Sequence, residues 1–287
     1  NTFYYIHWVP SESGPLILNY GKEIIKMKSN YNQIFYDVLD EIRIKTGMDN
    51  FIYSITLDSR MVFFSETYID DKFDHFDIID WFHHKTIGKI QNGLDETYHY
   101  SFSSNQKKYL NVHFKSDIKK KMRLFAQDTD SEIRNIGLGI FSAEVAARCI
   151  MNADYNASYA ILKVGKNNEV LIIKDNELVS YFKFKIQNKK YVLIENYGDI
   201  NLTKKTLKEI ELIINNKNKK IKLLDHLYFY QGKGKYSIID KLLLHNKSNI
   251  TPINIFSQLK FSGKKVINDH DSLLYAETGS SLWGIDV

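Results

Sequence analysis

Residues 158–185 carry the most constraining pattern in this chain, SYAILKVGKNNEVLIIKDNELVSYFKFK. β-Branched and aromatic residues dominate three short runs, and Gly, Asn and Asp gather between them at 164–168 and 174–177. This pattern predicts three strands joined by two tight turns. Lys163 falls on the first strand, next to the first turn. The type of this residue limits what the position can do. A lysine ammonium cannot coordinate a magnesium ion, because magnesium takes oxygen ligands.

Composition indicates a globular protein with substantial cores. A chain of 287 residues is long enough for one large domain or for two lobes. Hydrophobic residues make up 44% and charged residues 25%, which is ordinary for a globular chain. The aromatic content of 14% argues against disorder, because aromatic side chains bury large areas.

The charge pattern does not indicate a nucleic-acid partner. The formal net charge is only +5, and the densest basic runs are Lys119–Lys121 and Lys217–Lys222. Neither run is interleaved with a nucleic-acid motif, so both are expected to be solvated helix or loop faces rather than nucleic-acid or lipid sites.

The single cysteine and the hydropathy pattern predict a protein of a reducing compartment. One cysteine, Cys149, cannot form an internal disulfide. It lies in the helical pattern AEVAARCIM, which favours a small buried residue over a catalytic thiol. No apolar run of about 18 residues and no signal peptide are visible, so no membrane span is expected within these residues.

Strands and helices alternate along the chain, which is typical of the α/β class. The first half is expected to have a meander of strands at 3–9, 16–20 and 23–27, a helix at 32–46, paired strands at 51–57 and 61–67, a helix at 76–90, strands at 97–102 and 109–114, and a helix at 117–127. The second half is expected to have a strand at 132–139, a helix capped by Ser142, the meander at 158–185, a strand at 191–196, a helix at 201–215, a strand at 226–230, a helix at 236–245, an extended segment at 253–256, and a last helix capped by Asp271.

The order of elements resembles the actin-like superfamily, and in particular the PilM branch of type IV pilus assembly. The β-β-α-β-β-α order of 51–127 is similar to the subdomain that PilM shares with FtsA. Three segments carry the resemblance: IIDWFHHKTIGKIQNGLDETYHYSF (78–102), NIGLGIFSAEVAARCIM (135–151) and SLLYAETGSSLWGI (272–285). The resemblance implies an α/β, actin-like (ribonuclease H-like) two-lobed fold. Its first lobe would comprise 1–50 and 128–155, its inserted subdomain 51–127, and its second lobe 156–287.

The same resemblance implies three nucleotide-binding loops, and two of them lack their acidic residue here. In the first, an Asp-x-Gly turn would place backbone N–H groups against phosphate. The matching positions are His7 and Val9, and valine resists the open geometry that glycine allows. In the second, Lys163 replaces the acidic residue that faces the metal-bound phosphates, although Gly165 follows it. We expect His7 to be an ordinary strand histidine, and Lys163 to form a salt bridge with a nearby carboxylate.

The third loop is a Gly-Gly pair in the family and reads Gly232-Lys233-Gly234 here. A lone Gly-x-Gly is weak evidence for a nucleotide site. Phosphoryl transfer depends on metal-held positioning and charge neutralisation. We therefore expect no catalytic residues, no metal, no cofactor and no efficient ATP hydrolysis. Weak ATP binding stays open, because glycines remain in two loops.

Other chemistry has little support in the sequence. His83 and His84 would lie on adjacent helix faces, which does not make a metal pair. His99 and His113 fall on neighbouring predicted strands without enough further ligands for zinc. No GxSxG or Walker motif occurs.

The family resemblance implies a non-catalytic cytoplasmic scaffold of a pilus or secretion machine. Such a scaffold would grip the short tail of a bitopic membrane partner, PilN, in a groove formed by the strand at 3–9, the helix at 32–46 and the 51–127 unit. It would lie at the inner face of the inner membrane through its partners, without direct membrane insertion. Three alternatives remain: an active actin-like ATPase or kinase, a GspL-type cytoplasmic domain of a secretion system, and a degenerate actin-like protein of unrelated purpose.

Overall fold

The computed structural model describes residues 2–12, 14–24, 31–47, 50–68, 96–102, 105–114, 116–154, 156–245, 249–263 and 267–282. Its largest sheet is built on the meander that the sequence predicts. The strands of this part are β8 (Ser158–Val164), β9 (Asn168–Lys174), β10 (Glu177–Gln187), β11 (Lys190–Gly198), β12 (His226–Gln231) and β13 (Ile250–Pro252). Strands β8 to β11 are antiparallel neighbours, whereas β12 lies parallel to β8, and β13 parallel to β12.

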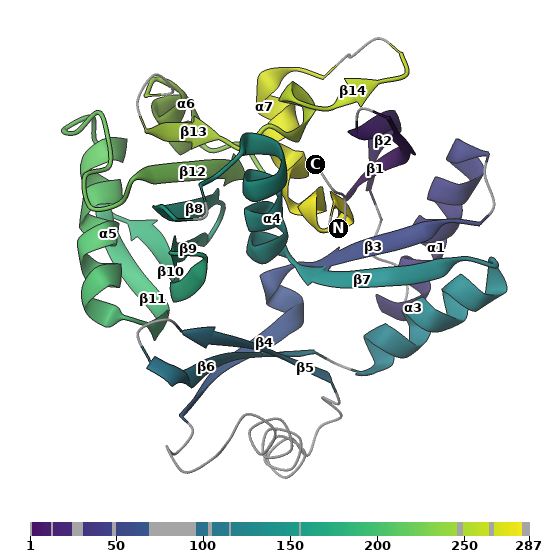
Figure 1. Ribbon diagram of the computed structural model, residues 1–287, viewed down its shortest axis with the longest axis horizontal. Coiled ribbons are helices and arrows are strands. Elements are labelled where there is room, and N and C mark those ends of the chain that lie inside the picture. The colour runs from purple at the N-terminus through teal and green to yellow at the C-terminus, as the bar shows by residue number, and fades with distance from the viewer. Residues whose placement is uncertain are drawn as a thin grey trace.

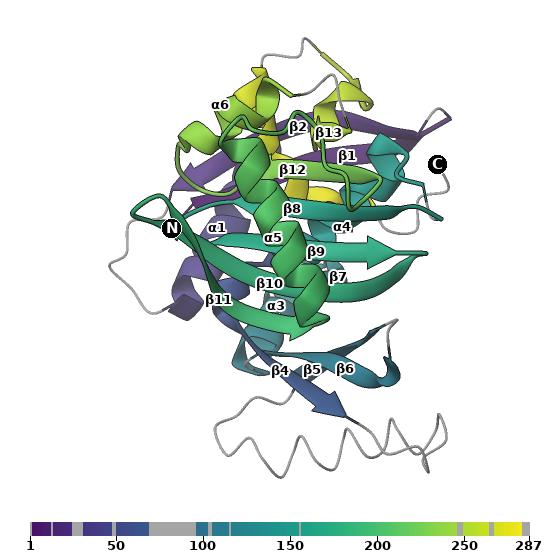
Figure 2. The ribbon, with the colours of Figure 1, turned by 90° about the vertical axis from the view of Figure 1, so that its left-hand side faces the viewer.

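Both faces of this part of the sheet are covered, which explains why its strands are apolar almost throughout. Ala160 and Leu162 of β8 pack in one core with helix α5 (Ile200–Ile214), and Tyr159 and Ile161 pack in another core with helix α4 (Gly139–Met151). Figure 2 shows α5 lying across the strands on the near face. The sheet is therefore the central layer of this lobe.

The same sheet continues into strands from the first half of the chain. β5 (Glu96–Phe102), β6 (Asn105–Phe114) and β4 (Val62–Tyr68) follow β10 in the strand order. The junction is a single parallel pairing of Leu178 with Phe102. Strands from the predicted inserted subdomain are thus hydrogen-bonded to the sheet of the second lobe.

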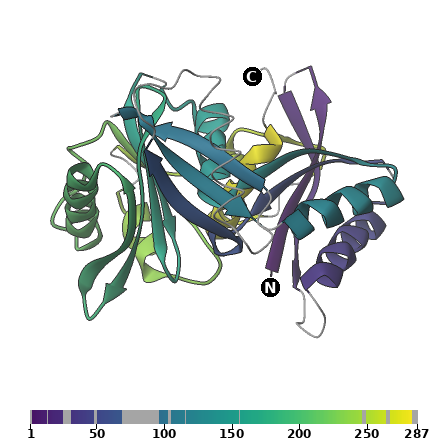
Figure 3. The ribbon, with the colours of Figure 1, turned by 90° about the horizontal axis from the view of Figure 1, so that it is seen from below.

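Two smaller sheets contain the remaining described strands. β1 (Thr2–Ser11) and β2 (Gly14–Ile24) make a hairpin, and β14 (Lys260–Phe261) lies parallel to β2. β3 (Ile52–Leu57) lies parallel to β7 (Glu132–Leu138). Helices α1 (Tyr31–Thr46) and α3 (Ser116–Asp128) lie side by side, as Figure 3 shows, with the Tyr36 and Phe125 rings 5.3 Å apart.

A small-residue interface joins α4 to the carboxyl-terminal segment. After α6 (Ser237–Leu243) and the short 3₁₀ helix η2 (Ile255–Ser257), α7 (Asp269–Ser272) leads into the 3₁₀ helix η3 (Leu273–Leu282). A Cβ atom on Gly279 would lie 2.7 Å from Cβ of Ala146, closer than real Cβ atoms approach. Glycine is therefore required where η3 packs on α4.

The structure corrects the predicted pairing of strands. One strand, β2, replaces the two predicted at 16–20 and 23–27, and the third strand of that sheet is β14. Strands 51–57 and 61–67 do not pair with each other, because β3 pairs with β7 and β4 with β6. The 3₁₀ turn η1 (Ser59–Met61), capped by the Asp58 side chain, links β3 and β4, and each strand has a distant partner.

Several predicted element ends are also corrected. α4 begins at Gly139, so Ser142 lies inside the helix and is buried instead of capping it. The last helical segment is capped by the Asn268 side chain rather than by Asp271. The segment predicted to be extended at 253–256 contains η2. Cys149 is half-buried rather than buried. The predicted helix at 76–90 lies outside the described residues.

Candidate functional site

The candidate site lies at the carboxyl ends of the parallel strands β8 and β12, where α/β sheets commonly place ligands. Lys163 and Tyr230 are register partners on these two strands. In Figure 1 both strands run toward the middle of the molecule, where the yellow carboxyl-terminal segment lies. Glu277 of that segment contacts Lys163, so the site lies where the main sheet meets η3.

Lys163 is surrounded by three carboxylates from three separate parts of the chain. Its Nζ atom lies 2.7 Å from Oε1 of Glu277, 3.4 Å from Oε1 of Glu169 and 3.9 Å from Oδ2 of Asp58. The Lys163 and Glu169 side chains are only 8% and 5% exposed. The predicted salt bridge of Lys163 is therefore present, and it has three partners. We call Lys163, Asp58, Glu169 and Glu277 the lysine cage.

Neighbouring hydroxyl groups fix the carboxylates of the lysine cage. The Tyr230 hydroxyl donates to Oε1 of Glu277 at 2.8 Å, and the Tyr181 hydroxyl donates to Oε2 of Glu169 at 2.8 Å. The Ser59 hydroxyl donates to Oε1 of Glu169, also at 2.8 Å. Buried carboxylates with several donors are held in one orientation. The cage is thus preorganised by β10, β12 and η1.

The electrostatics keep Lys163 and Asp58 charged. Burial alone would lower the pKa of Lys163, but Glu277, Glu169 and Asp58 outweigh it and raise that pKa above its ordinary value. Burial alone would raise the pKa of Asp58, but its bonds to Arg60 and the Lys163 charge hold that pKa below its ordinary value. Burial, followed by the adjacent carboxylates, raises the pKa of Tyr181 and of Tyr230, so both phenols remain hydrogen-bond donors at neutral pH.

The charge balance of the site is unfavourable for a phosphate. Three carboxylates stand against the buried Lys163 ammonium and the Arg60 guanidinium, which pairs with Asp58 at 2.7 Å but is 78% exposed to solvent, so one net negative charge remains. Like charges in a region of low dielectric repel strongly. Within the described ranges, no group of three or more His, Cys, Asp or Glu side chains is arranged to hold a metal ion. Among the described residues, Lys163 is the buried cation of this group, and the exposed Arg60 guanidinium pairs with Asp58.

The predicted glycines of the second and third loops lie close to Lys163. The Gly232 amide donates to the Val164 carbonyl at 2.8 Å, and a Cβ on Gly232 would lie 3.3 Å from Cε of Lys163. The Gly165 amide donates to Oδ1 of Asn168 at 3.2 Å. Both amides are therefore used inside the protein.

Gly234 supports its own turn rather than the cage. Its φ of +114° is a conformation that L side chains rarely adopt. Its carbonyl accepts from Nε2 of Gln231, and the Tyr236 hydroxyl donates to the Lys233 carbonyl at 2.7 Å. The turn is closed by these internal bonds.

His7 and Val9 belong to a different sheet from Lys163. They lie within the β1–β2 hairpin, opposite Asn19 and Leu16, and the hairpin turns later, between Ser11 and Gly14. The His7 ring packs edge-on against Phe51 with centroids 5.4 Å apart, and burial lowers the pKa of His7. The structure thus places His7 as a strand histidine in an aromatic contact.

The sequence analysis missed the acidic half of the cage, although one signal was present. Glu169 is directly opposite Lys163 in the β8–β9 pairing, so counting outward from the predicted turn finds it. Glu277 is the only acidic residue of the segment 272–282, whose neighbours are small or apolar. Nothing in the sequence distinguishes Asp58, because the segment that forms η1 resembles any polar turn between strands.

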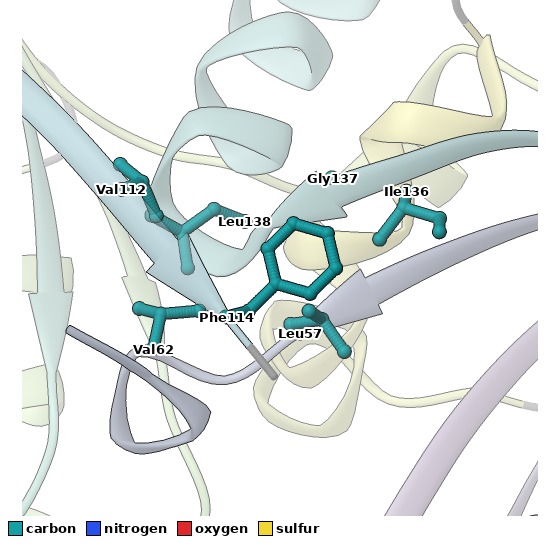
Figure 4. Close-up of a pocket in the computed structure, with 7 residues that line it drawn as sticks. All are labelled: Leu57, Val62, Val112, Phe114, Ile136, Gly137 and Leu138. Carbon is teal, nitrogen blue, oxygen red and sulfur yellow. The ribbon is translucent and has the colours of Figure 1, made fainter. Parts of the chain in front are cut away.

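A small apolar cavity lies near the cage and is shown in Figure 4. Leu57 and Val62, which flank η1, line it together with residues that include Phe114 and Leu138. Its volume of about 10 Å³ suits at most one water molecule. It is a packing defect rather than a ligand site.

Comparison with known proteins identifies the fold. No family model and no curated protein sequence matches the chain. Among solved structures, a chain of the PilM-PilN type IV pilus biogenesis complex matches with a TM-score of 0.59 and 7% identity, over 98% of this chain and 93% of that one. This chain has the actin-like fold of the PilM type. The fold class predicted from the sequence is therefore confirmed.

Two further solved structures match with lower scores. One is a Bacteroides thetaiotaomicron protein of unknown function with an actin-like ATPase fold (TM-score 0.41, 9% identity, 97% of this chain and 95% of that one). The other is the cytoplasmic domain of EpsL, an inner membrane component of the Vibrio cholerae type II secretion system (TM-score 0.41, 9% identity, 94% and 87%). Among the described residues of the present chain, every helix is too short or too polar to cross a membrane.

Proposed function

We propose that this protein is a non-catalytic, cytoplasmic actin-like component of a type IV pilus or related secretion machine, and that it binds the short tail of a PilN-like membrane partner. The lysine cage is the observation that carries the non-catalytic part. The likeness of fold to a chain of the PilM-PilN complex, over nearly the whole chain, supports the choice of machine and partner.

The charges of the lysine cage are unsuited to the metal-dependent chemistry of an ATPase. Phosphoryl transfer needs a divalent metal and positive groups around the transferred phosphate. Here the ammonium of Lys163 supplies the positive charge, and Glu277 and Glu169 already surround it. A nucleotide would have to bring its phosphates against a site in which carboxylates outnumber cations. Through Lys163, the same carboxylates connect η1, the β8–β9 hairpin and η3 without a bound ligand.

Exposed apolar residues on the first lobe are suited to an extended tail. Ile24 ends β2 and Ile44 lies in the last turn of α1, and they are 69% and 68% exposed. An ion pair from Lys45 to Glu23, at 2.5 Å, joins the two elements that carry these isoleucines. An extended peptide can place its apolar side chains against exposed apolar residues of this kind.

Calorimetry with two ligands tests the proposal. The first ligand is a peptide from the cytoplasmic tail of each bitopic membrane protein encoded beside this gene, and the second is ATP with magnesium. We expect heat from one tail and none from the nucleotide. Ile44→Asp should abolish tail binding, whereas Leu244→Asp, a matched change of an exposed side chain on the second lobe, should not.

Two results would refute the proposal. Magnesium-dependent ATP binding that is lost on changing Gly165 or Gly232 would show a working nucleotide site. If none of the tails encoded beside this gene binds, the proposed kind of partner is wrong.

A further inference from the structure

One end of the second lobe carries an unusually basic surface. Residues 199–225 contain seven lysines and four acidic residues, so they hold three of the five net positive charges of the whole chain. The seven lysines are exposed and lie on α5 and in the loop after it: Lys204, Lys205, Lys208, Lys217, Lys219, Lys220 and Lys222. We call these residues, with Leu223 and Leu244, the lysine surface.

Two of the four acidic residues of this segment, Glu209 and Asp225, accept hydrogen bonds from backbone amides and a serine hydroxyl. Oε2 of Glu209 accepts from the amides of Lys222 and Leu223 at 3.0 and 2.9 Å. Oδ2 of Asp225 accepts from the amide and hydroxyl of Ser158, both at 2.8 Å. Among the residues that the structure describes, no carboxylate forms an ion pair with any of the seven lysines. Their charges are directed to solvent.

Hydrogen bonds join the lysine-bearing loop to the end of α6, and each segment exposes a leucine. Asn249 donates to the carbonyls of Ile221 and Asp225 at 2.9 and 2.8 Å, and Nε2 of His245 lies 3.1 Å from Oδ1 of Asn216. Leu223 and Leu244 on these two segments are 37% and 75% exposed. The lysine-bearing loop is thus held against the segment that follows α6, while Leu223 and Leu244 remain exposed to solvent.

The helix end alone does not explain this surface. A helix carboxyl terminus favours cations only within its last turn, and Lys204 and Lys208 lie further back on α5. The surface contains lysine and no arginine. Lysine is a hydrated point charge on a flexible stem, whereas arginine is the residue that recognises one phosphate or carboxylate with a paired geometry. Such a surface is suited to many diffuse negative charges.

We propose that the lysine surface binds the headgroups of an anionic lipid bilayer, with Leu223 and Leu244 entering the interfacial layer. Clustered lysines attract anionic lipids, and neighbouring apolar side chains add burial at the headgroup boundary. The structure thereby revises the expectation that Lys217–Lys222 is only a solvated face, because it places Leu244 next to that run. This contact is separate from tail binding, which uses the first lobe.

Sedimentation with vesicles tests this inference. We expect the purified protein to bind vesicles of phosphatidylcholine mixed with phosphatidylglycerol, and not vesicles of phosphatidylcholine alone. The K217A/K219A/K220A variant should reduce the partition coefficient about a hundredfold, since each lysine near such a surface contributes roughly a factor of five. Leu223→Ser with Leu244→Ser should abolish the part of the binding that survives high salt, because salt screens only the charges.

A matched control removes the same charge elsewhere. K120A/K121A/R123A changes three basic residues of α3, in the predicted inserted subdomain, and should leave vesicle binding unchanged. Ile44→Asp should also leave it unchanged, which separates this test from tail binding. Equal binding to both vesicle types, equal loss in the α3 variant, or binding to a soluble acidic peptide but not to vesicles would each overturn the proposal.

Discussion

Removing the ammonium from the lysine cage should destabilise the protein more than any surface change. Lys163→Met keeps the length and apolar stem of the side chain but removes the counter-ion of Glu277 and Glu169, and it leaves Asp58 paired with the exposed Arg60 alone. Glu169 is 5% exposed and Glu277 26%, so water cannot replace the lost charge fully. Removing one partner of a buried ion pair costs about 3–5 kcal/mol. We expect a loss of that size in the free energy of unfolding, measured by urea titration with circular dichroism.

Lys166→Met is the matched control, because Lys166 lies in the turn of the same hairpin and is exposed. Exposed substitutions of this kind change stability by about 0.5 kcal/mol or less. The deficit of Lys163→Met should also shrink on acidification toward about pH 5, because its crowded carboxylates bind protons more readily when folded than when unfolded, and stability then rises as the pH falls. A loss below about 1 kcal/mol, or a deficit that grows in acid, would refute the account of the cage.

Three further outcomes follow from the same contacts. Glu277→Gln should cost about 1–3 kcal/mol, less than Lys163→Met, because the Tyr230 hydroxyl can still donate to the amide oxygen and Lys163 keeps two carboxylates; urea titration ranks the two variants. Gly279→Ala should cost about 1–3 kcal/mol by forcing η3 away from Ala146, whereas Gly263→Ala, which has open space around it, should be neutral in the same assay. The lowered pKa of Asp58 adds stability that is present above its ordinary value near 3.8 and lost as the pH falls through the folded-state value, so Asp58→Asn should be less sensitive to acid than the unmodified protein when the two are titrated with urea at neutral and acidic pH.

Local patterns predicted those elements whose causes lie within a few residues. The meander at 158–185 was predicted because turn residues separate strongly β-prone runs, and Asp175 and Asn176 do adopt positive φ values, of 51° and 62°. The helix after 199 was predicted from its apolar periodicity, and Asp199 caps it. These features depend on the backbone preferences of each residue and on its neighbours in the chain, and both follow directly from the sequence.

Pairings between distant segments were not predictable in the same way. β3 and β4 are adjacent in the sequence, yet β3 pairs with β7, and β4 with β6. Strand propensity does not choose a partner, and the 3₁₀ turn between them permits either arrangement. Likewise, β14 completes the first sheet from the far end of the chain.

The sequence by itself determined that a lysine occupies the first strand of the hairpin at 158–174, next to a tight turn. Only the tertiary structure decided that Lys163 is buried, and that Asp58 and Glu277 complete its surroundings. The physical reason is that an ammonium is too costly to bury alone, so its place inside the protein depends on carboxylates that chain folding brings from more than 100 residues away on either side.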